Sequence, residues 1–568
     1  MLRRLLKPGL ILVAGLSGAA LLIGGLSNYP GSKLVYVLFT IIFWLMLITA
    51  LGKRTRYGYF FLSIALWMGF WGKITAHLIL KYPYVEPIGH FDGSVTAWDS
   101  VLWVAIVASA GVMLSGFLFT MLGKKYSRFA GIDEAMVPVW YPAVRGWVWS
   151  VSLTVIVGFA AINLILGIQQ IGLVPRTILP WPLNALIAWQ VSIGSSLLLA
   201  VLLWWEVSLK KSISVSAYTL LIEAITSTTS LLSRGVYVFH TIPQFFSLYN
   251  NRISLLGLSK TKVFALMLAF TCLMVLSISG VTTFRAYLYP HAGGFTTADQ
   301  IRLTRLEVIE GGIANVKKLI AQGEPQEGHL RELQAEKLRL EKKLSSNEAK
   351  SSVVATRIKT GESKNVAAQE ATGDSLLENK DKLINEFYYQ IDKGALPRIL
   401  SLVVDRWIGV EGVMAVSAYP EKSNKLLLDA ITEKRGIGTT TKFQEIANSH
   451  YRWVDANIWQ FASLPGAAAF FYFSGSMWVV MLGMAIFALV LQVSEQLIFR
   501  LTSNPLLCSI FGLTLANTIS QFGVTPRQDI PFYSMIFGFV ILVVIVQSDK
   551  VFRVYLKYVA HRGKRGSV

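Results

Sequence analysis

The chain has 568 residues, of which 53% are hydrophobic and only 15% are charged, whereas soluble domains carry roughly a quarter charged residues. This composition excludes an ordinary soluble enzyme. Lysine and arginine outnumber aspartate and glutamate by 53 to 33, giving a formal net charge of +20, but basic loops that fix membrane topology explain this excess without a nucleic-acid partner.

Apolar runs of about twenty residues recur along the chain, which is the length that a helix needs to cross roughly 30 Å of hydrocarbon. They predict an all-α polytopic membrane protein embedded in a lipid bilayer. Ten spans are expected, at about 8–27, 33–51, 58–80, 99–122, 147–172, 182–206, 262–284, 467–497, 505–523 and 531–548. The first follows a basic start and is expected to be a retained signal anchor.

The orientation of the spans follows from basic residues, which resist translocation and collect in cytoplasmic loops. They fill alternate connections: Arg3, Arg4 and Lys7; Lys53, Arg54 and Arg56; Lys124, Lys125, Arg128 and Arg145; Lys210 and Lys211; Arg252, Lys260 and Lys262; and the tail from Lys557 to Arg565. The short connections between them carry one basic residue each. Both termini are therefore expected in the cytoplasm and the polar segment 286–462 outside.

The stretch 213–250 is rich in serine and threonine and fits two arrangements. It forms either two cytoplasmic amphipathic helices or a polar pair that crosses out and back, with breaks near Arg234-Gly235 and Pro243. The two arrangements differ by an even number of membrane crossings, so later segments lie on the same side of the membrane in both. We therefore expect ten to twelve transmembrane helices, with the large polar segment external either way.

The chain divides into an N-terminal transmembrane bundle (1–285), an external helical domain (286–462), C-terminal transmembrane helices (463–550) and a basic cytoplasmic tail (551–568). In the external domain, apolar residues recur three or four positions apart on both sides of a linker that contains Gly323, Pro325 and Gly328. This pattern predicts a helical coiled-coil hairpin at about 297–345. The hairpin either packs on itself or is a docking surface for another membrane protein.

Several kinds of chemistry have no signature in the sequence. Walker, Rossmann, HExxH and GxSxG motifs are absent, and seven scattered histidines form no close ligand pair. Cys272 and Cys508 both fall within apolar spans, so neither a disulfide framework nor a cysteine-based zinc site is available. No metal and no cofactor is therefore expected, and organic side chains must supply any catalysis.

Lys73 and His77 lie four residues apart in the third predicted span and so share one helical face. Ionisable groups at such depth are costly and usually point into a polar cavity. In the alternative interpretation, Lys73 extends toward the headgroups and His77 bonds to a neighbouring carbonyl. The sequence leaves both open.

Arginines are interleaved with aromatic residues in the second half of the external segment. They are Arg398, Arg406, Arg435 and Arg452, beside Trp407, Tyr419, Tyr451 and Trp453, and Arg234 joins them if its turn faces outward. Because a guanidinium grips phosphate through two parallel hydrogen bonds and aromatic rings stack on sugars, this set suits a ligand with a diphosphate head and a glycan. Binding of lipid headgroups is the alternative.

Three stretches of the chain, 233–240, 405–420 and 465–476, resemble the Wzy-type O-antigen and oligosaccharide repeat-unit polymerases. The order of elements is also similar: many spans, a large external loop late in the chain, then a few closing spans. The insertion at about 297–378 departs from the shorter family members. The family's arginine-x10-glycine spacing is not reproduced, because Ser417 stands eleven residues after Arg406 while Gly409 and Gly412 come earlier.

The resemblance implies a GT-C-like fold in the bacterial inner membrane and a metal-independent, inverting glycosyltransferase. Such an enzyme polymerises oligosaccharide repeat units carried on undecaprenyl diphosphate, and a chain-length regulator is a possible partner for the external hairpin. The substrate-binding residues would be Arg234, Arg406, Arg435, Arg452, Tyr451 and Lys73. The candidates for the general base are Glu411, Asp405 and His77, and the sequence does not rank them.

Other functions remain open at this stage. An O-antigen ligase would use the same chemistry with a different acceptor. A flippase or secondary transporter of polyprenyl-linked glycans would usually show internal repeats and little external mass, neither of which the chain displays. A scaffold or sensor with a coiled-coil ectodomain would account for the hairpin but not for Lys73, His77 or the arginines.

Overall fold

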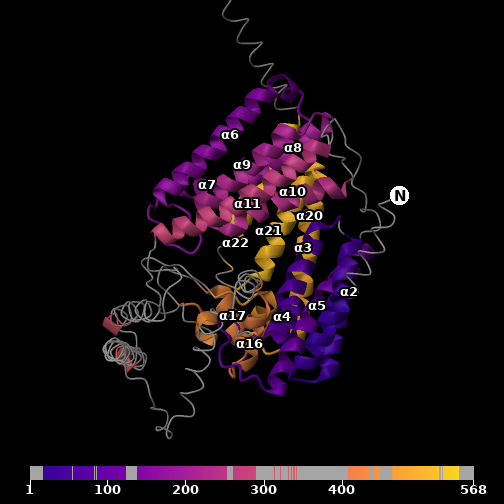
Figure 1. Ribbon diagram of the computed structural model, residues 1–568, viewed down its shortest axis with the longest axis vertical. Helices are drawn as coiled ribbons and strands as arrows, with labels where there is room; N and C mark the ends of the chain where they lie inside the picture. The colour runs from indigo at the N-terminus through magenta and orange to yellow at the C-terminus, as the bar shows by residue number, and fades with distance from the viewer. Residues whose placement is uncertain are drawn as a thin grey trace, which may run out of the picture.

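The computed structural model is built from helices joined by loops throughout the residues that it describes (Figure 1). These are 17–53, 55–81, 84, 86–122, 137–251, 260–288, scattered positions between 313 and 341, 404, 407–433, 440–447, 449, 463–523, 526 and 529–548. Eight candidate spans in this part of the chain are long and apolar enough to cross a membrane. The predicted polytopic helical membrane protein is therefore confirmed.

The described helices follow one another along the chain. Their bounds are α2 (Lys33–Gly52), α3 (Tyr57–Leu66), η1 (Trp67–Gly72), α4 (Lys73–Leu80), α5 (Val95–Leu122), α6 (Tyr141–Leu166), α7 (Leu183–Trp189), η3 (Gln190–Gly194), α8 (Ser195–Ser208), α9 (Ser214–Leu231), α10 (Arg234–Asn250), α11 (Lys260–Leu288), α16 (Val410–Ala418), α17 (Asn424–Thr432), α18 (Lys442–Ile446), α19 (Ala467–Tyr472), α20 (Met477–Thr502), α21 (Pro505–Ser520) and α22 (Asp529–Gln547). Residues 17–28 are helical as well. Helix α21 is shorter than the candidate spans.

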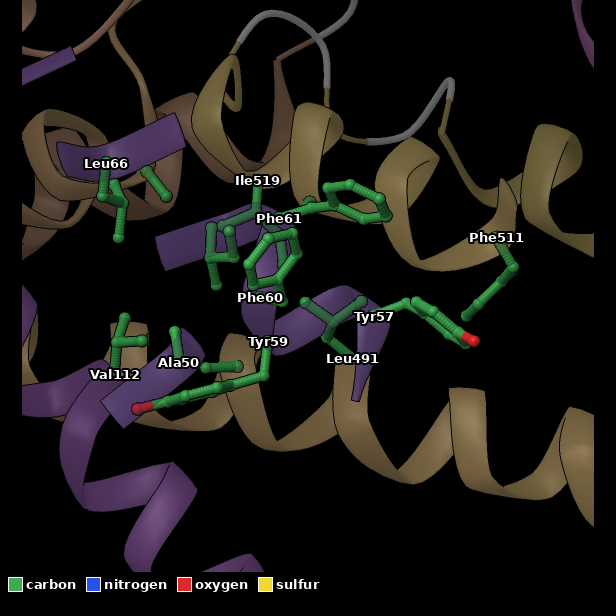
Figure 2. Close-up of a cluster of buried hydrophobic side chains, with 14 of the residues drawn as sticks. Ala50, Tyr57, Tyr59, Phe60, Phe61, Leu66, Val112, Leu491, Phe511 and Ile519 are labelled. Carbon is green, nitrogen blue, oxygen red and sulfur yellow. The ribbon is translucent and has the colours of Figure 1, made fainter. Parts of the chain in front are cut away.

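Helices α3, α5, α20 and α21 form the centre of the bundle, with α20 packed along α5 and α21 along α3. Figure 2 shows the aromatic side chains of α3, among them Phe60 and Phe61, gathered beside Leu491 of α20 and Ile519 of α21. Lipid tails are as apolar as leucine, so helices in a membrane gain from close approach at small residues. Gly512 allows α21 to approach α3 closely, because a Cβ there would lie 2.6 Å from the backbone nitrogen of Gly58.

Two candidate spans contain a π-helical turn. The span Tyr57–Leu80 consists of α3, η1 and α4, and the span Leu183–Ser208 consists of α7, η3 and α8. A π-helical turn interrupts the regular ladder of backbone hydrogen bonds and is frequently found at functional sites. In this chain each of the two turns lies next to a buried ion pair.

The serine- and threonine-rich stretch forms two helices, α9 and α10, that pack on each other. The chain reverses between them at Leu232, which has a φ of 52°. Figure 1 shows both among α6, α8 and α11, and α10 also packs against α21. This packing agrees with the out-and-back arrangement. The expected break at Arg234-Gly235 falls at the start of α10, whereas the one at Pro243 is wrong, because α10 continues through that residue.

Two predicted spans differ from the observed helices. The predicted span 467–497 is divided into α19 and α20 by a turn in which Gly475 has a φ of 74°. The predicted span 147–172 ends early, because Gly167 adopts a φ of 63° and closes α6 at Leu166. Gly167 caps α6 directly, whereas Gly475 lies in the turn that follows α19, and both take a left-handed conformation that glycine adopts readily.

Most of the predicted hairpin at 297–345 lies outside the described residues. The scattered positions described between 313 and 341 are helical, and Lys337 forms an ion pair of 3.7 Å with Glu341 one turn later. The second half of the predicted external domain is better described. Its helix α16 packs against α5 and α19, and its side chains from Val410 to Val416 are buried.

Candidate functional site

Lys73 is the first residue of α4, directly after the π-helical turn η1, and its side chain is fully buried. Its ammonium forms an ion pair with the carboxylate of Glu411 on α16. It also donates a hydrogen bond of 2.8 Å to the carbonyl oxygen of Trp407. Of the two alternatives left by the sequence, the structure agrees with a lysine that points into the protein rather than toward the headgroups.

Glycines allow the backbones on both sides of this pair to meet. A Cβ on Gly69 of η1 would lie 2.1 Å from the carbonyl oxygen of Ile408, and a Cβ on Gly409 would lie 2.9 Å from the carbonyl oxygen of Gly69. Side-chain carbons do not approach other atoms so closely in proteins. The span and the segment that leads into α16 therefore touch through backbone atoms, which sets Lys73 opposite Glu411.

A second glycine contact joins α16 to the start of α19. A Cβ on Gly412 would lie 2.0 Å from the carbonyl oxygen of Pro465. The contact brings together the stretches 405–420 and 465–476, which both carry the family resemblance. Gly409 and Gly412, which do not fit the family's spacing, are thus required at their positions by packing.

Glu411 lies in the first turn of α16, where the positive end of the helix dipole stabilises a carboxylate. Burial raises the pKa of the Glu411 carboxyl above its ordinary value, while the ammonium of Lys73 and, more weakly, His77 lower it. Moving a charged group out of water costs roughly several kcal/mol unless a group of opposite charge compensates it. Lys73 is that partner.

His77 lies one turn after Lys73 and is also buried. Its ring stacks on the ring of Tyr84, with 3.9 Å between the centroids and 20° between the planes. His77 and Lys73 lie one turn apart on α4, and Lys73 pairs with Glu411. Three of the residues singled out in the sequence, Lys73, His77 and Glu411, are therefore gathered in one place.

Lys422 fixes the far end of α16. Its ammonium donates hydrogen bonds of 2.9 Å to the carbonyl oxygen of Ser417 and 2.5 Å to that of Tyr419, and it lies 5.7 Å from the centre of the Tyr472 ring. A cation at this end of a helix binds the last carbonyl groups and complements the helix dipole. Lys422 thereby holds the orientation of α16, which carries Glu411.

No family model, no curated protein sequence and no solved structure matches the chain. The chemistry of its own residues must therefore carry the functional argument.

Arg234 belongs to another part of the molecule. It is the first residue of α10 and is half-buried at the turn between α9 and α10. This turn packs on the loop that follows α6, where the backbone nitrogen of Ile171 donates a hydrogen bond of 3.0 Å to the carbonyl oxygen of Leu231. Arg234 is thus placed by the hairpin, while Lys73 and Glu411 are placed by α4 and α16.

Five other site candidates lie outside the described residues: Asp405, Arg406, Arg435, Tyr451 and Arg452. Asp405 and Arg406 directly precede Trp407, whose carbonyl oxygen binds Lys73. Their positions relative to Glu411 remain predictions.

Sequence reasoning missed two contributors to the site. The Trp407 carbonyl oxygen is a backbone atom, and no residue pattern marks it as a partner of Lys73. Tyr84, which stacks on His77, follows the third span in the aromatic sequence Tyr82-Pro83-Tyr84. An aromatic cluster directly after a span that contains an ionisable residue was the available signal.

The arrangement combines a buried carboxylate, an ammonium and an imidazole at the beginning of a helix. The carboxylate or imidazole can accept a proton, and the ammonium can stabilise an anion that forms beside it. Among the residues that the structure describes, no group of three or more His, Cys, Asp or Glu side chains is arranged to hold a metal ion. Acid–base chemistry and anion binding are what these side chains offer.

Proposed function

We propose that the protein is a metal-independent membrane glycosyltransferase that polymerises oligosaccharide repeat units linked to undecaprenyl diphosphate. The observation that carries the proposal is the buried Lys73–Glu411 pair, which joins a membrane span to a helix in one of the stretches that resemble repeat-unit polymerases. A second such stretch is in contact with the same helix at Gly412 and Pro465. Of the candidates for the base, Glu411 belongs to this pair, and His77 lies one turn beyond Lys73 on α4.

In the proposed reaction, Glu411 accepts the proton of the acceptor hydroxyl. The hydroxyl oxygen bonds to the anomeric carbon of the donor glycan as the bond from that carbon to the carrier diphosphate breaks. The leaving diphosphate keeps the electron pair, and its charge is compensated by Lys73 and by Arg406, Arg435 and Arg452. Once Glu411 is neutralised, the ammonium of Lys73 no longer faces a carboxylate charge and attracts the departing anion.

The proposed enzyme has a GT-C-like arrangement of ten to twelve crossings in the bacterial inner membrane. Both termini are cytoplasmic, and 286–462 is periplasmic, where its hairpin is available to a chain-length regulator. Two highly exposed tryptophans, Trp181 before α7 and Trp478 at the start of α20, both fall at the proposed periplasmic ends of spans. Tryptophan is enriched at both membrane–water interfaces, and Trp147 near the proposed cytoplasmic end of α6 is similarly exposed, so these residues support the positions of the span ends and not the orientation.

The test is polymerisation by the purified protein in liposomes, with carrier-linked repeat units as the only glycan. We expect a ladder of products linked to undecaprenyl diphosphate for the parent protein and none for Glu411→Gln. The matched control is Glu495→Gln on α20, because Glu495 is also buried and, among the described residues, accepts hydrogen bonds from the backbone nitrogens of Tyr57 and Gly58, at 2.9 and 2.7 Å, rather than pairing with a cation.

Two other results would replace the proposal. Transfer of single repeat units to lipid A core, without chain growth, would identify a ligase. Movement of the carrier-linked unit across the bilayer, without any new glycosidic bond, would identify a flippase.

A further inference from the structure

A second buried ion pair lies in the hairpin of α9 and α10, and the proposed glycosyl transfer does not use it. The Nδ1 atom of His240 lies 2.7 Å from Oε1 of Glu223, and its Nε2 atom lies 3.0 Å from the carbonyl oxygen of Ser192 in the π-helical turn η3. Glu223 Oε1 also accepts a hydrogen bond of 2.9 Å from the hydroxyl of Ser227. Both side chains are almost completely buried.

Counting hydrogens in this geometry leads to one shared proton. The Ser192 carbonyl oxygen only accepts, so His240 Nε2 must carry a hydrogen. A second hydrogen must then stand between Nδ1 and Glu223 Oε1, since two lone pairs 2.7 Å apart would repel each other. The closed hairpin therefore contains one labile proton, held between His240 and Glu223.

The other carboxylate oxygen, Glu223 Oε2, has no hydrogen-bond partner among the described residues although it is buried. A buried polar atom without a partner costs free energy. The carboxylate is thus held mainly by the shared proton and by Ser227. Without the proton, Glu223 would be more stable in contact with water than in the closed hairpin.

The neighbouring helices supply no second charge to the pair. Within the part of the chain that the structure describes, the Glu223 and His240 side chains form hydrogen bonds and ion pairs with Ser192, with Ser227 and with each other. Ionisable side chains described on the helices that contact the hairpin, or elsewhere in it, are Tyr57 of α3, Tyr141 and Arg145 of α6, Glu206 of α8, Lys262 and Cys272 of α11, Cys508 of α21, and Tyr218, Arg234, Tyr237 and Tyr249. Of these, Arg145 and Tyr141 bind Glu206.

Polar side chains extend from the pair toward both ends of the hairpin. On α10 they recur at helical spacing on one face as His240, Gln244, Ser247 and Asn251, and the Ser247 hydroxyl meets the Tyr57 hydroxyl at 2.9 Å. On α9 they are Glu223, Ser227 and Ser230, and Asn163 of α6 donates a hydrogen bond of 2.7 Å to the Ser230 hydroxyl. The pair thus lies within a buried polar track rather than in an apolar core.

We propose that Glu223 and His240 form a proton-binding site that closes the α9–α10 hairpin when it is occupied and lets the hairpin open when the proton leaves. The ligand of the site is a proton. No bond between heavy atoms changes, and the released proton passes to water. The site lies six residues beyond Arg234 on the same helix, so opening the hairpin would also displace Arg234.

The proposal predicts a specific pH dependence. An imidazole in water loses its proton above about pH 6.5, so the open hairpin holds one proton fewer than the closed hairpin above that pH. The ratio of open to closed molecules must then rise about tenfold for each pH unit, until the closed pair itself loses its proton.

The experiment measures how fast a buried cysteine reacts with N-ethylmaleimide. Ala224→Cys, in a Cys272→Ala, Cys508→Ala background, places the thiol on α9 beside Tyr237 of α10 and Leu266 of α11, where it is shielded while the hairpin is closed. The same protein with Glu223→Gln is the reference, because an amide N–H replaces the shared proton and keeps the hairpin closed at any pH. The ionisation of the exposed thiol changes with pH in the same way in both proteins. Its effect therefore cancels in the ratio of their reaction rates.

We expect the ratio of parent to Glu223→Gln rates to rise about tenfold per pH unit above neutrality. The double variant Glu223→Gln, His240→Gln, which is neutral and can join the two helices by an amide–amide hydrogen bond, should give the same result as a reference if Glu223→Gln alone fails to fold. With Glu495→Gln in place of Glu223→Gln, the ratio should stay constant with pH. A flat ratio for both hairpin variants would overturn the proposal, whatever the protein polymerises, because the readout does not depend on glycan transfer.

Discussion

The two buried ion pairs of this protein are built differently. The Lys73–Glu411 pair connects distant parts of the chain, since 334 residues separate Lys73 from Trp407, its second partner. The Glu223–His240 pair joins two adjacent helices, and its members are 17 residues apart. Backbone contacts at Gly69 and Gly409 hold the first pair in place, whereas the second is bordered by a carboxylate oxygen that has no hydrogen-bond partner in the described part of the chain.

The side-chain chemistry of each ion pair determines what the pair is able to do. The first pair joins an ammonium to a carboxylate that backbone contacts hold opposite each other, so a reacting group or a competing anion is needed to disturb it. A histidine changes its charge in the physiological range, so the second pair responds to protons. The site with fixed charges suits catalysis, and the site with a titratable charge suits control of a moving hairpin.

The largest effect on stability is expected from removing one partner of the Lys73–Glu411 pair. Lys73→Met or Glu411→Leu alone leaves a buried charge uncompensated and should lower the free energy of unfolding by about 3–5 kcal/mol. The double variant Lys73→Met, Glu411→Leu leaves no charge and should recover most of this loss. Denaturation of the purified variants in detergent measures both. Equal losses in the single and double variants would contradict a compensating pair.

Replacing Arg406 or Arg435 with lysine should impair polymerisation while the fold is kept. A point charge does not reproduce the planar, bidentate grip of a guanidinium on a diphosphate. Each lost charge-assisted hydrogen bond is worth about 1.5–3 kcal/mol, or about a ten- to hundred-fold loss of rate. The control is Arg56→Lys in the loop before α3. Unchanged glycan ladders, even for the alanine variants, would mean that these arginines only contact headgroups.

Gly69→Ala tests the backbone contact that sets Lys73 opposite Glu411. The added methyl would lie 2.1 Å from the carbonyl oxygen of Ile408, so the strain should cost about 1–3 kcal/mol of unfolding free energy. Gly158→Ala in α6 is the matched control, because nothing lies within 4 Å of its Cβ. There we expect a gain of about 0.5–1 kcal/mol, since alanine favours a helix. Similar behaviour of the two variants would exclude a tight contact at Gly69.

Glu223→Gln should have the smallest effect on stability at neutral pH. The glutamine amide supplies the hydrogen that the shared proton supplies in the parent, so the unfolding free energy should change by less than about 1 kcal/mol. Glu411→Gln, in contrast, leaves the ammonium of Lys73 without a counter-charge and should cost more. A direct comparison of the two variants by thermal unfolding separates a protonated pair from a fixed ion pair. Equal losses would remove the distinction between the two regions.

The sequence predicts most of the membrane spans because an uninterrupted apolar run of about twenty residues has few other uses. The sequence does not predict helix boundaries that depend on the backbone conformation of a single residue. The left-handed Gly475 divides a predicted span in two, and α10 continues through Pro243 where a break was expected. Neither follows from apolar periodicity.

The candidate site was predictable in its parts but not in its assembly. Lys73 and His77 stand out as ionisable residues within a span, and Glu411 stands out through the resemblance of its stretch to repeat-unit polymerases. Nothing in the linear sequence indicates that positions 73 and 411 meet, because the contact depends on backbone approach at Gly69 and Gly409. The Glu223–His240 pair was missed for a similar reason, since its helices had to be aligned before the two side chains faced each other.

The most direct test of the central claim is the rate at which purified protein extends carrier-linked repeat units in EDTA. The parent should polymerise at a rate close to that with magnesium, because Lys73 and the arginines supply the compensating charge. Glu411→Gln should be slower by about a hundredfold to ten-thousandfold, the usual contribution of a general base, while remaining folded. Collapse of the parent rate in EDTA with recovery in magnesium, or a Glu411→Gln rate close to that of the parent, would contradict the account.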